Sequence, residues 1–182
     1  MKELLNIVNE NDEVIGQESR EKIHELGLLH REVHVYFATP NRELIFQHRA
    51  KDKDTYPDLL DATVGGHVEI GDSYEKTAIK ETAEETGVQL NVADLILIKK
   101  TKRCFKDEVT QKINNAIGES YLYIFKGNLE DLKIETGKSL GFEAWPIEKL
   151  VNLDDNDSKK FIPYILGFIK TEVVSVINTL NI

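Results

Sequence analysis

Residues 65–72 (GGHVEIGD) and 80–88 (KETAEETGV) decide how this sequence is interpreted. Two adjacent glycines lead into a segment that places Glu81, Glu84 and Glu85 within five residues and then stops at a glycine. Helical residues three or four apart share a face, so the three carboxylates can converge. They repel one another unless a cation lies among them, and their oxygens suit Mg²⁺ or Mn²⁺. Because glycines also allow close backbone approach to a ligand, the pattern favours a metal site over a merely solvated acidic helix face.

Composition and charge limit the kinds of protein that this chain can be. Its 182 residues are 41% hydrophobic and 30% charged, with a net charge of −9, which is typical of a soluble globular protein. The acidic balance argues against broad binding to a nucleic-acid polymer. Cys104 is the single cysteine, so no intrachain disulfide can form and a reducing compartment is favoured. The N-terminal residues turn polar too early for a signal peptide, and no apolar run approaches the roughly 20 residues that cross a membrane. We therefore expect a cytoplasmic protein.

Hydrophobic periodicity and turn residues predict clusters of strands separated by helices. Strands are expected at residues 4–8, 14–16, 33–38, 44–47, 59–64, 92–98 and 120–125, with a polar hairpin over 99–118. Helices are expected between Ser19 and Gly27 and at 73–86, 147–151 and 158–180, the last one kinked or divided by Pro163 and Gly167. This mixed order indicates an α+β fold, a mixed α/β sandwich. Without repeats or a long linker, residues 1–182 are expected to form a single domain, with the hairpin and short helix at 4–26.

The complete pattern over residues 66–88 resembles the Nudix box, Gly-x5-Glu-x7-Arg-Glu-U-x-Glu-Glu-x-Gly-U, in which U is a bulky aliphatic residue. Every defined position matches except three: Asp72 stands at the first acidic position, Lys80 at the arginine and Thr82 at the first aliphatic one. The first two exchanges keep the sign of the charge, and these side chains are expected to hold the loop against the helix. The resemblance implies a Nudix fold, in which a mixed sheet lies between helices.

The same resemblance implies a hydrolase that cleaves a P–O bond of a small molecule containing a diphosphate. Glu81, Glu84 and Glu85 would hold Mg²⁺ or Mn²⁺, with the carbonyl of Gly65 as a further ligand, so that a bound water is activated. The general base would be one of these glutamates or Glu119 outside the box.

Further segments resemble the Nudix branch that includes isopentenyl-diphosphate isomerase. They are residues 10–12, 14–16, 27–31, 47–49, 56–57 and 64–67, together with His24. The isomerase requires a catalytic cysteine where this chain has Gly65, and Cys104 lies too far along the chain to match it. We therefore expect hydrolysis. Isomerase activity is one alternative, and a non-catalytic module that binds a nucleotide or a protein is another, against which the intact carboxylates argue.

The isomerase resemblance also implies a second metal site. His30, His67 and Glu119 match metal ligands there, and His24 is one position out of register with another. Imidazole suits Mn²⁺ or Zn²⁺. The alternative is that these histidines form hydrogen bonds with backbone groups beside the loop.

Two basic residues are candidates for binding the substrate. Arg49 and Lys53 match isomerase residues that hold the diphosphate, although both could equally be solvated surface charges. The expected partner is thus a small diphosphate, with neither a nucleic-acid polymer nor a membrane. Residues 161–169 are apolar enough to pack on this domain or on a second copy in a homodimer.

Overall fold

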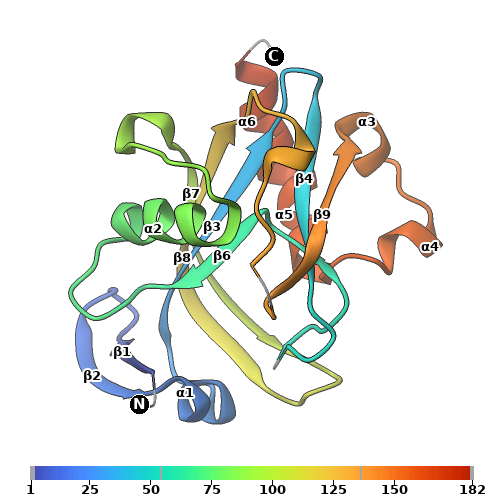
Figure 1. The fold of residues 1–182 in the computed structure, drawn as a ribbon. Coiled ribbons are helices and arrows are strands. Elements are labelled where there is room, and N and C mark those ends of the chain that lie inside the picture. Colours follow the sequence, from blue (N-terminus) through green and yellow to red (C-terminus); the bar gives the residue numbers. More distant parts are fainter. Residues whose placement is uncertain (1–2, 54, 136, 181–182) are drawn as a thin grey trace.

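A seven-stranded mixed sheet forms the centre of the structure (Figure 1). The computed structural model describes residues 3–53, 55–135 and 137–180. The sheet contains β3 (His30–Ala38), β4 (Glu43–Arg49), β5 (Leu60–Asp61), β6 (Val64–His67), β7 (Ile96–Lys106), β8 (Ile113–Ile124) and β9 (Ser139–Pro146). A separate hairpin, β1 (Leu4–Val8) and β2 (Val14–Ser19), precedes α1 (Arg20–Leu26). The other α-helices are α2 (Tyr74–Thr86), α3 (Ile147–Leu150), α4 (Asp155–Ser158), α5 (Pro163–Phe168) and α6 (Val174–Thr179).

Strand β3 organises the sheet because it pairs with three other strands. β8 runs parallel to all of it. Its other edge is shared between β6, which pairs with residues 32–35, and β4, which pairs only with Phe37 and Ala38. Between β5 and β6, the Thr63 hydroxyl accepts a hydrogen bond from the Phe37 amide and donates one to the Ile45 carbonyl. β4 and β6 therefore diverge from a common neighbour, and residues of both line the pocket described below.

The two faces of the sheet are covered by different helices. Successive strand residues point to opposite faces, so Tyr36 of β3 packs with the C-terminal helices while Val35 and Phe37 pack with α2. The core around Tyr36 includes the C-terminal side chains of Ile162, Ile165, Leu166, Ile169, Val173 and Ile177. Figure 1 shows α2 on one side of the sheet and α5 and α6 on the other. The expected α+β sandwich is confirmed, and residues 161–169 pack on their own chain.

The strands differ from expectation in three places. Residues 92–94 form a 3₁₀ turn closed by a capping box between Asn91 and Asp94, so β7 begins only at Ile96. The hairpin expected over 99–118 is present, because β7 and β8 pair antiparallel as far as Lys106 and Ile113 and leave 107–112 as its tip. The expected strand 59–64 is divided into β5 and β6. Strand β9 carries no clear alternation and was not expected.

The helix expected over 158–180, kinked or divided by Pro163 and Gly167, begins only at Pro163. Backbone bonds join Leu60 to Lys160 and Ile162, so this segment pairs beside β5 and cannot be helical. Pro163 then occupies the first turn of α5, a position that suits its missing N–H. A π-helical stretch, Ile169–Val173, separates α5 from α6. In the described part of the chain, every helix is too short or too polar to span a bilayer.

Candidate functional site

Helix α2 presents the acidic cluster because both of its ends are fixed. The Ser73 hydroxyl accepts a hydrogen bond from the Lys76 amide at 3.2 Å, and Gly87 ends the helix in the left-handed region at φ 75°. Gly66 allows the preceding loop to lie against the helix: a Cβ there would be 2.6 Å from Cγ and Cδ of Glu81. A side chain at position 66 would therefore displace the Glu81 side chain.

Glu81 and Glu85 line a cavity of about 310 Å³, whereas Glu84 is exposed beside it. An oxygen of Glu85 accepts hydrogen bonds from the Gln47 amide nitrogen at 3.0 Å and from the Gly65 backbone at 3.4 Å. Burial raises the pKa of Glu81 to about 7. Burial and the neighbouring Glu81 raise the pKa of Glu85 to about 8. A half-buried and a buried carboxyl group that line one cavity and resist ionisation fit a divalent cation, which would restore their charged form.

The two exchanged residues of the box do not pair with each other. The Lys80 ammonium contacts Glu69, and Asp72 contacts Lys76 one turn along α2. Each basic residue thus still joins the loop to the helix, as expected, but through a different partner.

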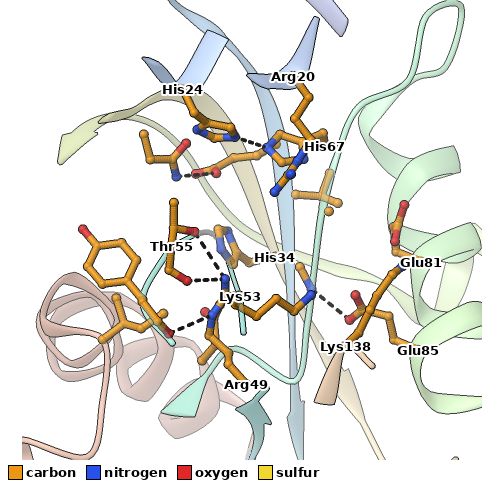
Figure 2. A pocket seen from close by; sticks show the side chains of 18 of the residues that line it. Arg20, His24, His34, Arg49, Lys53, Thr55, His67, Glu81, Glu85 and Lys138 are labelled. Carbon is orange, nitrogen blue, oxygen red and sulfur yellow. Dashed lines mark hydrogen bonds and ion pairs between the residues drawn. The ribbon is translucent and has the colours of Figure 1, made fainter. Parts of the chain in front are cut away.

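The cavity also contains basic side chains (Figure 2). The Arg49 guanidinium donates to Asp61 at 2.9 Å and to the carbonyls of Thr55 and Tyr56 at 2.7 and 3.1 Å. It therefore holds the loop after β4, and its N–H groups already have hydrogen-bond partners there. Lys53 differs, because its ammonium makes no hydrogen bond or ion pair with the described residues, and burial and Arg49 lower its pKa.

Lys138 lines the cavity, although no local sequence pattern indicates it. It lies just before the unexpected strand β9, and its ammonium pairs with Glu135 at 2.9 Å. Its charge acts to lower the pKa values of Glu81 and Glu85. Arg20 and Glu3, from the N-terminal unit, also line the cavity.

Three histidines form a compact cluster, and two of them, His24 and His67, line another part of the cavity. His24 comes from α1, His30 from the start of β3 and His67 from the end of β6. Each pair of ring centroids is 5.1 Å apart, and one nitrogen from each ring lies within 4.8 Å of the others. Nε2 atoms of His24 and His67 are 3.0 Å apart.

The cluster supplies neutral imidazoles, in which Nε2 of His24 accepts the hydrogen bond from Nε2 of His67. Nδ1 of His24 faces the Ile113 carbonyl at 3.2 Å and Nδ1 of His30 faces the Leu28 carbonyl at 3.0 Å, so both Nδ1 atoms donate. Burial lowers all three pKa values, that of His24 to about 4. Nε2 of His30 is buried without a hydrogen-bond partner among the described residues. The chemistry fits Zn²⁺ or Mn²⁺.

Glu119 does not join these histidines. Its carboxylate accepts a hydrogen bond from the Tyr121 hydroxyl and lies 3.5 Å from the Lys100 ammonium. In the parallel register, Glu119 lies beside Val33, whose side chain packs in the core under α2. His30 has the opposite orientation, since it is an odd number of residues from position 33. The third member of the cluster is therefore His24, which α1 brings into place.

Residues 28–165 match the family model described as the NUDIX domain. The chain belongs to this family. It is similar to a Nudix hydrolase of Clostridium acetobutylicum, with 30% identity over 85% of this chain and 75% of the relative. It spans 47–57% of the length of other curated Nudix relatives. The family assigns it to the Nudix-type pyrophosphohydrolases as a class.

Solved Nudix structures share the fold. A crystal structure of a Deinococcus radiodurans protein superposes with a TM-score of 0.62 and 24% identity, covering 82% of this chain and 87% of the other. The NUDIX domain of Shewanella oneidensis NrtR, crystallised with ADP ribose, gives a TM-score of 0.56 and 13% identity, covering 84% and 96%. At these identities the likeness concerns the fold.

Proposed function

We propose that this Nudix protein is a metal-dependent hydrolase that cleaves a P–O bond in a small molecule containing a diphosphate. The observation that carries the proposal is the pair Glu81 and Glu85. Both line the same cavity, and burial raises the pKa values of their carboxyl groups to about 7 and 8. Glu84, exposed at the edge, and the Gly65 carbonyl are proposed to complete the ligands for Mg²⁺ or Mn²⁺.

The basic residues of the cavity have separate roles in this proposal. A bound divalent ion supplies charge neutralisation and a water of lowered pKa. Lys53 binds a diphosphate oxygen, because its ammonium is uncommitted. Arg49 supports the loop that carries Lys53 and adds positive charge at the cavity wall. A glutamate of the box is the general base, since Glu119 is engaged by Tyr121 and Lys100 and does not line the cavity.

A panel of diphosphates with Mg²⁺ tests the hydrolase directly. ADP-ribose is included because the Shewanella NUDIX domain binds it, and isopentenyl diphosphate is included to score isomerisation. We expect release of a phosphorylated product that is lost in Glu85→Gln and retained in Glu75→Gln, a substitution on the same helix outside the cavity. Isomerisation without release would establish the isomerase alternative. Ligand binding without either reaction would establish the binding module.

We propose in addition that His24, His30 and His67 bind a transition-metal ion such as Zn²⁺ or Mn²⁺. The cluster geometry and the unpartnered Nε2 of His30 support this. Titration with Co²⁺ should produce the visible absorption of a nitrogen-ligated ion, and His30→Ala should abolish it. His48→Asn is the matched control, because His48 lies outside the cluster beside Asp58. Equal Co²⁺ spectra in both variants would contradict the site.

A further inference from the structure

His34 of β3 is a pocket residue that neither metal proposal uses. The residue is only 4% exposed, yet it lines the cavity. Its Nδ1 lies 2.8 Å from Nη2 of Arg103. A guanidinium has no acceptor, so Arg103 must donate and Nδ1 of His34 must accept. The proton of this neutral imidazole is therefore on Nε2.

The arrangement that fixes this tautomer is itself held firmly. Nε and Nη2 of Arg103 donate to one oxygen of Glu32 at 3.1 and 2.6 Å. The other oxygen of Glu32 accepts from the Asn114 amide at 2.9 Å. The side chains of Arg103 and Glu32 are 8% and 7% exposed, so moving either one would leave the other charge buried and unpaired. Burial and Arg103 both lower the pKa of His34, which keeps the ring neutral.

Gly65 leaves Nε2 of His34 accessible from the cavity. A Cβ at position 65 would lie 3.5 Å from Cδ2 and 3.7 Å from Nε2 of His34, so a longer side chain would extend over this edge of the ring. Nε2 has no hydrogen-bond partner within the described ranges. The amide of the same glycine contacts Glu85. Figure 2 shows the His34 ring between the His24–His67 pair and Lys53.

We propose that His34 is a binding residue that donates an Nε2–H hydrogen bond to an oxygen of the substrate's diphosphate. This inference rests on the proposed function, since it assumes that the diphosphate binds beside Glu85. Diphosphate oxygens are acceptors, and a locked N–H offers them a donor of fixed direction. The flexible ammonium of Lys53 supplies charge but little direction. His34 would thus position the diphosphate that the basic residues attract.

The first test uses the non-hydrolysable probe methylenediphosphonate with Mg²⁺. In ¹⁵N spectra of histidine-labelled protein, we expect His34 to show a protonated Nε2 and an unprotonated Nδ1, with Nε2 shifting when the probe binds. A protonated Nδ1, or failure of the probe to bind or to move the Nε2 signal, would overturn the inference. Because the probe cannot be cleaved, this result is independent of hydrolysis. A chain that binds it through His34 but hydrolyses nothing refutes the hydrolase and keeps the donor.

Two variants separate the donor from a structural role. The amide nitrogen of Gln reaches the place of Nε2, whereas the shorter Asn reaches only that of Nδ1. His34→Asn should weaken binding of the Mg²⁺ probe about tenfold, the effect of losing one hydrogen bond, and His34→Gln should restore most of it. Equal affinities in both variants and the wild type would contradict the proposal. If His34→Asn does not fold, the wild-type spectra and the Gln variant decide it.

Discussion

Replacing Gly66 with alanine tests whether the position of Glu81 matters for the reaction. The added Cβ would lie 2.6 Å from Cγ and Cδ of Glu81. Glu81 must move away by about 0.8 Å to reach 3.4 Å, the start of ordinary contact. Overpacking of this kind costs about 1–3 kcal/mol of folding stability, and a displacement near 1 Å in an active site costs about 100-fold in rate.

Gly65→Ala is the matched control because it places the same methyl group on the next residue. There the Cβ would meet His34 at 3.5 Å, an ordinary contact, and the backbone carbonyl is retained. We expect Gly66→Ala to lower kcat/KM about 100-fold and to weaken Mn²⁺ binding measured by calorimetry, with a modest fall in Tm. Gly65→Ala should leave Mn²⁺ affinity within about twofold. Wild-type Mn²⁺ affinity and activity in Gly66→Ala, or equal loss of Mn²⁺ affinity in both variants, would refute the reasoning.

Three further predictions concern other parts of the structure. Lys53→Met should raise KM about tenfold with little change in Tm, whereas Arg49→Met should mainly lower Tm, because Arg49 forms hydrogen bonds with the loop and with Asp61. Steady-state kinetics give KM and calorimetry gives Tm, and the reverse pattern would contradict the roles. Asp12 is held by Lys100, Arg31 and Tyr74, which lower its pKa against the effect of burial. The ionised Asp12 carboxylate should therefore stabilise the fold fully near pH 7, and this stabilisation should be lost as pH falls below about 4. Urea unfolding should show Asp12→Asn to be about 1 kcal/mol less stable than wild type at pH 7 and equal to it at low pH. Ile169→Ala should cost about 2–5 kcal/mol in urea unfolding, because its side chain is fully buried; a loss below about 1 kcal/mol would show that the C-terminal segment contributes little.

The features predicted well from the sequence are those specified by local signals. Ser73 and Gly87 bound α2 as their residue types suggest, and Gly66 is required by the close approach of Glu81. Glu81 and Glu85 share a cavity because they are four residues apart on one helix. For these residues, short-range geometry is enough.

The features that were missed depend on pairing between distant segments. Glu119 matches a metal ligand of the isomerase in sequence, yet its side chain points to the face of the sheet opposite His30. Only the register of β8 with β3 reveals this. His24 enters the cluster because α1 closes at Gly27 and turns the chain toward β3. Lys138 precedes β9, whose pairing with β4 has no local sequence signal. Arg49 has the residue type of a phosphate ligand, but its loop partners are visible only in three dimensions.

The N-terminal unit has a consequence for how the cavity can change between relatives. Glu3, Arg20 and His24 line the cavity, but all three precede the first residue that matches the family model. The sheet and α2 contain the carboxylates of the site, while one wall of the cavity comes from the β1–β2 hairpin and α1. Exchanging residues 3–27 for the equivalent segment of a relative would therefore alter the shape and charge of that wall without touching the carboxylates. Such grafts offer a modular way to vary ligand preference on an unchanged scaffold.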